Sequence, residues 1–308
     1  LDVLREECNI PVWHDDAQGT ACVTLAGILN ALKLVNKKLS EVKIVYFGAG
    51  ASNTTIARLI ITDGGDPKKM IMFDSHGGLH KNREDIKADK RFYRKWEICE
   101  QTNPNCIDTM EEAMKDADVL ISLSTPGPDT IKQDWVRAMG NKSIVFACAN
   151  PVPEIYPYAA KEAGAYIVAT GRGDFPNQVN NSIGFPGILK GALMVRASKI
   201  TDAMAIAAAH SLANYAEKRG INIDNIVPTM DEADVFPVEA ADVAMQAIKD
   251  GVARTKMTWD EAYQMAKKDI EYSRSMAKSL HDNGFIADPP VEMLEDALSW
   301  TVKQIEGK

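Results

Sequence analysis

The sequence has few cysteines, and their spacing argues against a zinc site or a disulfide framework. There are five in 308 residues, an odd number, and no two of them form a C-x-x-C pair. We therefore expect reduced thiols and a cytoplasmic protein. The five are Cys8, Cys22, Cys99, Cys106 and Cys148.

The sequence also lacks an excess of basic residues. It has 35 Lys and Arg against 43 Asp and Glu, which gives a net charge of −8. Nucleic acids bind to concentrated basic faces, so we expect no nucleic-acid partner. We identify no signal peptide and no apolar run long enough to span a bilayer, and we expect no membrane partner. An initiator Met is missing and the first seven residues resemble the middle of a helix, so we expect a fragment.

The stretch from Val42 to Asn53 predicts a strand, a tight turn and the start of a helix. An apolar, β-branched run ends in glycines one residue apart, and a helical pattern follows. Such glycines let a diphosphate approach the backbone, and a helix N-terminus offers it unpaired N–H groups. Asn53 stands where the full fingerprint has Gly or Ala, which suggests a looser contact between helix and strand. The predicted cofactor-binding residues are Gly48, Ala49, Gly50, Ala51, Ser52 and Asn53.

A second predicted strand, Met70 to Asp74, ends in a carboxylate 21 residues beyond Asn53. That distance is typical of the group that binds the adenosine ribose hydroxyls. A carboxylate there favours NAD, because it would repel a 2′-phosphate, although Lys81 and Arg83 leave NADP open. The mixed charges from residue 81 to 95 predict a solvated helix face, with an oligomer contact or a ribose-phosphate site as alternatives.

Strands and helices alternate along the chain as far as residue 169. This order predicts an α/β protein with a Rossmann-like, doubly wound parallel sheet. Open sheets of this kind bind ligands at the carboxyl ends of their strands. The predicted strands 118–122 and 143–147 lead into Ser124, Thr125 and Asn150, which we predict as cofactor contacts. Asn180 and Asn181 end an amide-rich loop and predict contacts to substrate or nicotinamide.

From residue 183 onward the spacing of apolar residues predicts an α-rich C-terminal region. We therefore predict a dinucleotide-binding domain over residues 15–182. Residues 183–308, together with residues 1–14, would complete a second domain on the substrate side.

An adjacent pair of carboxylates, Asp15 and Asp16, precedes these elements. Such a pair most often caps a helix or solvates a turn. Here Gly19 follows closely, and small residues are typical of a backbone that another group approaches. The helix predicted over residues 21–35 then leads into the dinucleotide strand, so the pair should lie at the mouth of the nucleotide crevice.

Three segments of the sequence, in this order, resemble those of malic enzymes. They are residues 9–20, residues 150–154, and residues 169–181 with 184–187. The resemblance implies oxidative decarboxylation of malate to pyruvate and CO2, with a nicotinamide cofactor and Mg²⁺ or Mn²⁺. It further implies a small-molecule substrate and a homo-oligomer.

The resemblance also implies roles for individual residues. Asp16 would be a metal ligand, and Asp15 a catalytic residue that orients the lysine serving as general base. Asn150 and Asn181 would contact substrate and nicotinamide, with Asn180 beside them. Malic enzymes take that lysine, a tyrosine and a Glu-Asp pair of ligands from a region before His-Asp-Asp, so we expect the chain to be incomplete alone.

Two other functions explain part of the sequence. An amino-acid-type NAD(P)-dependent dehydrogenase would explain Gly48, Gly50 and Asp74, but it would give Asp15 and Asp16 no function. A non-catalytic nucleotide-binding module would bind cofactor without metal-dependent turnover.

Overall fold

The computed structural model describes residues 1–306. It comprises a large compact unit, Leu1–Ala266, and a smaller one that begins at Lys267. The domain boundary that we expect after residue 182 lies inside the large unit and stays a prediction.

A six-stranded sheet in the order β3-β2-β1-β4-β5-β6 forms the centre of the large unit. Its strands are β1 (Ile44–Phe47), β2 (Met70–Asp74), β3 (Gly77–Gly78), β4 (Val119–Ser122), β5 (Ile144–Ala147) and β6 (Ile167–Thr170). All pairings are parallel except that of β3, which runs antiparallel to β2 at the sheet edge. The parallel order confirms the Rossmann-like prediction. β3 was not predicted, because two glycines have no strand propensity.

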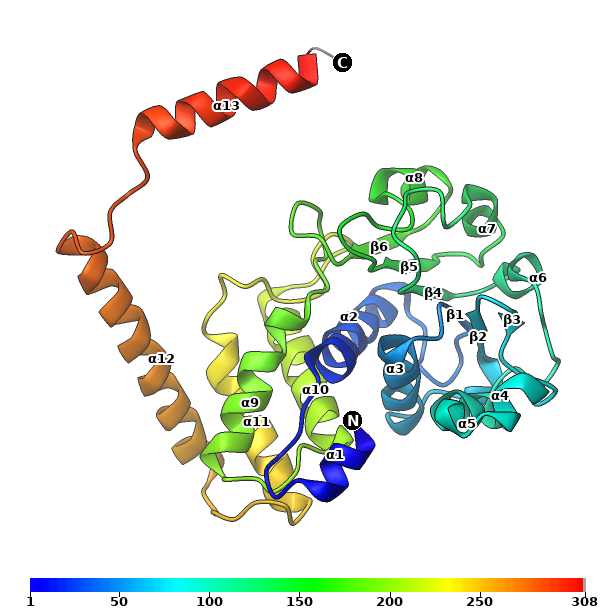
Figure 1. Cartoon of the computed structure of the whole chain (residues 1–308), viewed down its shortest axis with the longest axis horizontal. Coiled ribbons are helices and arrows are strands. Elements are labelled where there is room, and N and C mark those ends of the chain that lie inside the picture. Colours follow the sequence, from blue (N-terminus) through cyan, green and yellow to red (C-terminus); the bar gives the residue numbers. More distant parts are fainter. Residues whose placement is uncertain (307–308) are drawn as a thin grey trace. The chain divides into compact units, whose positions relative to one another are not determined.

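Both faces of the sheet are covered by helices (Figure 1). Side chains alternate along each strand, so Ile44 and Tyr46 enter one apolar cluster while Val45 enters the other. The short helices α6 (Met110–Met114), α7 (Gln133–Arg137) and α8 (Pro157–Glu162) supply the second cluster. This two-sided burial explains why the strands are almost entirely apolar.

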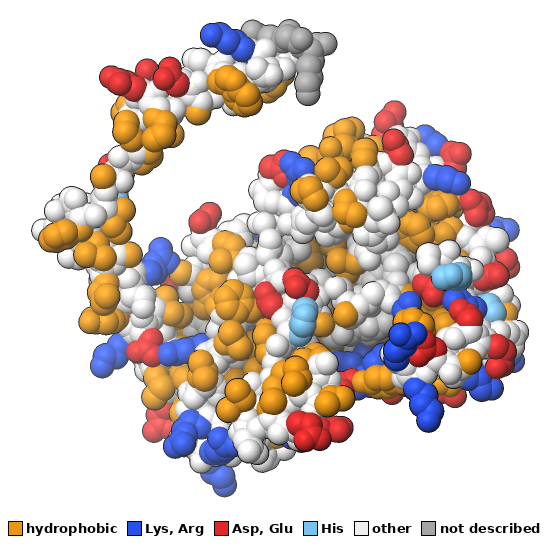
Figure 2. All heavy atoms as spheres, in the orientation of Figure 1, with side chains coloured by type: hydrophobic (Ala, Val, Ile, Leu, Met, Phe, Trp, Pro, Cys, Tyr) orange, Lys and Arg blue, Asp and Glu red, His pale blue; other side chains and the backbone are white. Residues whose placement is uncertain are grey.

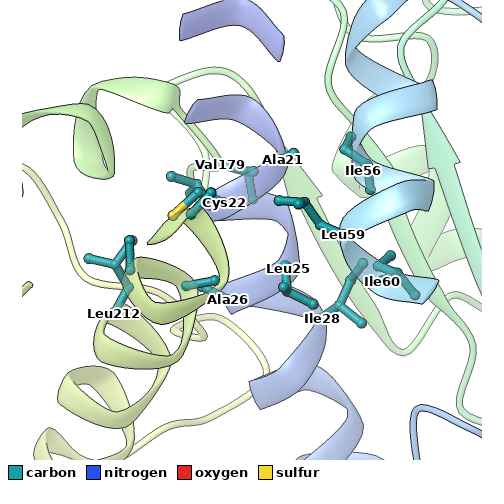
Figure 3. Close-up of a cluster of buried hydrophobic side chains, with 14 of the residues drawn as sticks. Ala21, Cys22, Leu25, Ala26, Ile28, Ile56, Leu59, Ile60, Val179 and Leu212 are labelled. Atoms are coloured by element: carbon teal, nitrogen blue, oxygen red, sulfur yellow. The ribbon is translucent and has the colours of Figure 1, made fainter. Parts of the chain in front are cut away.

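Helix α2 (Thr20–Val35) joins the sheet layer to the helical region, because it packs against both α3 (Ala51–Thr62) and α10 (Asp202–Arg219). Figure 3 shows its Leu25 and Ile28 beside Ile60 of α3, and its Ala26 on the side of Leu212 of α10. A helix that is apolar on all sides is expected to be buried.

The same helix corrects one expectation from the sequence. The continuous helical segment Asp15–Val35 is long and apolar enough to cross a membrane, so the prediction that no such run exists was wrong. Most of the segment is buried inside the protein. It is therefore a core helix of this fold.

The helical region predicted after residue 183 is also confirmed. α9 (Phe185–Met194) and α11 (Val235–Lys249) pack against each other and on α10, and α12 (Trp259–Asp282) and α13 (Val291–Glu306) follow. We did not predict α9, because its first turn contains Pro186 and Gly187 and looks like a loop. The remaining helices are α1 (Asp2–Glu7), α4 (Glu84–Ala88) and α5 (Tyr93–Gln101), with short helical turns at η1 (Asp15–Gly19), η2 (Pro67–Lys69), η3 (Lys90–Phe92) and η4 (Asn181–Ile183).

Candidate functional site

The turn between β1 and α3 has the geometry that its two glycines predict. Gly48 has φ +99°, and a Cβ atom there would collide with the carbonyl oxygen of Leu123 in the loop after β4. Gly50 has an ordinary φ of −79°, and a Cβ atom there would have no neighbour within 4 Å. The first glycine thus closes the turn, and the second leaves open space before the first turn of α3. A phosphate group can approach the backbone there.

We expected Asn53 to loosen the contact between helix and strand, but it does not. Its side chain is fully buried, and its Nδ2 donates to the carbonyl oxygens of Phe47 at 3.2 Å and Gly48 at 2.7 Å. The amide ties α3 to the end of β1 by hydrogen bonds, where a small residue would only allow close packing. The expectation from the imperfect fingerprint was therefore wrong.

A cavity of about 280 Å³ lies between this turn and the loops after β4 and β5. Six of the residues predicted from the sequence line it together, whereas the predicted Thr125 does not. The six are Asp16, Ser52, Ser124, Asn150, Asn180 and Asn181, and the other lining residues are Thr20, Leu123, Pro126, Cys148, Ala149 and Val179. We call this space the first cavity.

The Asp16 side of the first cavity is joined to the other segments by side-chain contacts. Asn181 Nδ2 donates to Asp16 Oδ1 at 3.4 Å, and Ser52 Oγ donates to the Asp16 carbonyl oxygen at 2.7 Å. Asn180 Oδ1 accepts from the Ser182 N–H at 2.9 Å, so this side chain also caps the turn that carries Asn181. The contacts bring residues from three distant parts of the sequence to one edge of the sheet.

Asp15 is half-buried, whereas the neighbouring Asp16 is exposed. A Cβ atom at Gly19 would collide with Asp15 Oδ1, so the close approach that Gly19 predicted is made by this carboxylate. Asp15 Oδ1 is buried and has no hydrogen-bond partner in residues 1–306. Burial and the neighbouring Asp16 charge raise the pKa of Asp15 above its ordinary value. The Trp13 side chain lowers this pKa in part, although neither Trp13 Nε1 nor Asp15 Oδ1 makes a hydrogen bond of regular geometry in these residues.

Glu154 is a structural residue of the site that we did not predict. It is fully buried, and its Oε1 accepts from Ser122 Oγ at 2.7 Å and from the Ser124 N–H at 2.8 Å. Its Oε2 accepts from the Ala149 N–H at 3.0 Å. Glu154 therefore fixes the loops after β4 and β5 to each other. A glutamate directly after Pro-Val-Pro beyond a buried strand was the available signal.

A second cavity, of about 300 Å³, lies on the other side of the glycine turn and is lined by several cationic side chains, each of which is paired with a carboxylate. Ala49, Gly50 and Ala51 line it with residues of α1, α3 and the start of α5. Its only carboxylate is that of Asp2. Its cationic side chains are Arg5, Arg58, Arg91, Arg94 and Lys95. Three of them come from the mixed-charge run, whose assignment as a solvated face or as a ribose-phosphate site stays a prediction.

Asp74 lines neither cavity. Its two oxygens accept from Arg83 Nη1 and Nη2, each at 3.0 Å, and Lys95 Nζ lies 3.7 Å away. Burial opposes ionisation of Asp74, but Arg83 and the His76 N–H outweigh it and hold its pKa below the usual value. Its predicted contact to the ribose hydroxyls stays a prediction. The repulsion expected for a 2′-phosphate is reduced, because cations already neutralise the carboxylate.

A complete metal site is not present in the described part of the chain. Residues 1–306 contain no group of three His, Cys, Asp or Glu side chains that could hold a cation. Asp16 is the one carboxylate that lines the first cavity. Because Mg²⁺ and Mn²⁺ sites use several oxygen ligands, these residues can supply only part of such a set.

Fold and site together define a dinucleotide-binding α/β domain. The family model described as "Malic enzyme, NAD binding domain" matches residues 17–249. The crystal structure of the Entamoeba histolytica malic enzyme has a TM-score of 0.97 and 66% sequence identity, and covers 99% of this chain and 63% of that one. The chain belongs to the malic enzyme family.

Curated relatives in this family use either nicotinamide cofactor. The NAD-dependent malic enzyme of Geobacillus stearothermophilus is 40% identical over 252 residues, which are 82% of this chain and 51% of its own. The NADP-dependent malic enzyme of Halomonas elongata is 38% identical over 270 residues, 82% of this chain and 61% of its own. The chain thus spans between half and two thirds of these relatives. The family assignment removes the amino-acid-type dehydrogenase alternative.

Proposed function

We propose that this chain forms the cofactor-binding part of the active site in an enzyme that converts malate to pyruvate and CO2 by oxidative decarboxylation. The supporting observation is the first cavity, where Asp16, Asn150 and Asn181 meet beside the glycine turn. The diphosphate would lie at Gly50 and Ala51, with the nicotinamide in the first cavity and the adenosine toward the second.

The residues of the first cavity have chemistry that suits this reaction. Asn150, Asn180 and Asn181 carry neutral amides, which can orient the malate carboxylates and the nicotinamide amide by hydrogen bonds without adding charge. Asp15 would position the general base of the reaction through its unpaired buried oxygen. Mg²⁺ or Mn²⁺, with Asp16 as one of its ligands, would polarise the C2 hydroxyl group and the enolate that follows CO2 loss.

Replacing Asp16 tests the metal-dependent part of this proposal. In the intact enzyme, Asp16→Asn is expected to lower Mn²⁺-dependent malate oxidation by roughly a hundredfold or more, because it removes a charged metal ligand. Cofactor affinity, measured by calorimetric titration, should stay unchanged.

The matched control is Asp129→Asn, which changes an exposed carboxylate that does not line the first cavity. This variant should leave both Mn²⁺-dependent malate oxidation and cofactor affinity unchanged. Equal malate oxidation by Asp16→Asn and wild type at limiting Mn²⁺ would rule out a metal-ligand role for Asp16.

We also propose that the chain binds NADP, in place of the NAD that Asp74 alone favours. Arg83 and Lys95 together neutralise Asp74. Arg91 and Arg94 line the second cavity in ion pairs with Asp89 and Asp2, and a 2′-phosphate would compete for these cations. Lys95→Ala is therefore expected to weaken NADP binding about tenfold, or about 1.4 kcal/mol, with little change for NAD. Calorimetric titration of both cofactors measures this difference. Lys87→Ala, which changes a lysine outside the cavity, is the control. If Lys95→Ala weakened the binding of NAD as much as that of NADP, the proposal would be contradicted.

A homo-oligomer and a cytoplasmic location stay predictions. Apolar side chains lie exposed along α12 and α13, as Figure 2 shows in orange, and a second subunit would cover them. The exposed residues include Tyr272, Met276, Leu294, Leu298, Trp300 and Ile305. All five cysteines are free, which supports a reducing compartment.

A further inference from the structure

Glu239 of α11 is a fully buried acid that the proposed reaction does not use. Its side chain has no solvent exposure, and neither carboxyl oxygen has a hydrogen-bond partner that meets normal geometry in the described chain. A buried carboxyl group without a cation is costly. Its surroundings should therefore explain why a glutamate stands at this position.

The carboxyl group lies against the first turn of α9. A Cβ atom at Gly187 would collide with Glu239 Cδ and Oε2, so only glycine leaves room for it. α9 begins directly after η4 (Asn181–Ile183), which carries one of the proposed substrate ligands. Glu239 thus lies under the segment that leads into the first cavity.

The same start of α9 also packs against α2. A Cβ atom at Gly184 would lie 3.2 Å from Cys22 Sγ, and Cys22 is buried one turn beyond η1, which carries Asp16. Asn181 and Asp16 then meet at 3.4 Å above this contact. The buried packing of α11, α9 and α2 therefore includes the segments that lead to both sides of the first cavity.

The surroundings of Glu239 favour its protonated form. No ion pair within 4 Å joins it to any cation in residues 1–306. Burial raises the pKa of Glu239 well above its ordinary value, the Gly187 N–H offsets this only in part, and Asp242 of the same helix adds to it. From α2, the facing titratable group is the Cys22 thiol, whose pKa burial also raises.

We propose that Glu239 is a positioning residue: through its close packing on Gly187, its neutral carboxyl group holds the start of α9, and with it Asn180 and Asn181, against the turn that carries Asp16. The placement of these segments is a property of the fold. Only the ligand roles of the asparagines depend on the proposed function.

The protonated state is tested by the pH dependence of unfolding. The unfolded chain releases the Glu239 proton near pH 4.5, whereas the folded chain keeps it to higher pH. Folded wild type therefore holds one more proton above pH 4.5, and its stability relative to Glu239→Gln should fall as the pH rises. Above pH 4.5 we expect the ratio of the two unfolding constants to change with pH in this direction, by up to tenfold per pH unit for as long as the folded chain keeps the proton. Parallel curves for the two proteins would overturn the proposal.

The positioning role is tested by hydrogen exchange without substrate or cofactor, so the result does not depend on the proposed reaction. Glu239→Leu, which fills the space without polar atoms, should raise exchange in residues 180–188 at least tenfold and leave β1 unchanged. Glu239→Gln, which keeps a neutral polar group, should stay close to wild type at pH 6. Unchanged exchange in residues 180–188 of the leucine variant, or an equal rise in β1, would overturn the proposal.

Discussion

Gly50→Val is expected to weaken dinucleotide binding by roughly a hundredfold or more, about 2.7 kcal/mol, while the melting temperature stays close to that of wild type. The backbone at Gly50 has an ordinary φ, and a Cβ atom there would meet nothing within 4 Å. A valine is therefore accommodated in the free protein. Its methyl groups would occupy the space through which the diphosphate reaches the N–H groups of α3.

Gly48→Val provides the contrast for this experiment. Gly48 has φ +99°, and a side chain there would collide with the Leu123 carbonyl oxygen. We expect this variant to lose stability as well as binding, because both the backbone conformation and the packing would be strained. Fluorescence titration with NADPH and thermal unfolding measure the two effects separately. Tight binding by Gly50→Val would contradict the diphosphate position.

Glu154→Ala is expected to lower the free energy of unfolding by about 3–5 kcal/mol, because it leaves several buried donors unpaired. These donors are Ser122 Oγ and the N–H groups of Ser124 and Ala149. Their loops line the first cavity, so cofactor affinity should fall with stability. Chemical denaturation measures the free energy of unfolding.

The matched variant Glu154→Gln should lose less stability than Glu154→Ala. Its amide oxygen can still accept from Ser122 and Ser124, but its NH2 group would face the Ala149 N–H, which is also a donor. We therefore expect an intermediate stability. A Glu154→Ala variant as stable as wild type would show that the buried carboxylate is not needed to join the two loops.

Local patterns in the sequence predicted the architecture and half of the residues that line the first cavity. The glycine turn after β1 and the polar ends of β4 and β5 are local features, because strand, turn and helix signals depend on neighbouring residues. Parallel strands place their carboxyl ends along one edge of a sheet, so Ser52, Ser124 and Asn150 could be grouped without a structure.

The remaining features depend on contacts between distant residues. The pairing of Asp74 with Arg83 and the close packing of Glu239 on Gly187 carry no local signature. The position of Glu154 after Pro-Val-Pro is a local signal, but its hydrogen-bond partners at the end of β4 and in the loop after it are not. The Asn53 amide reaches back to β1, which a glycine-based fingerprint does not anticipate. Side-chain partners therefore had to come from the structure, even where the residue itself was already singled out.

The most direct test of the account is a fluorescence titration of this 308-residue chain with NADPH, with Gly50→Val measured alongside. The account predicts saturable binding at one NADPH per chain, with a dissociation constant on the order of 1–100 μM, in the range typical of enzymes for their ligands. The Gly50→Val variant should show almost no NADPH binding at these concentrations. No saturation by wild type at millimolar NADPH, or equal binding by the two proteins, would contradict a dinucleotide site at this turn.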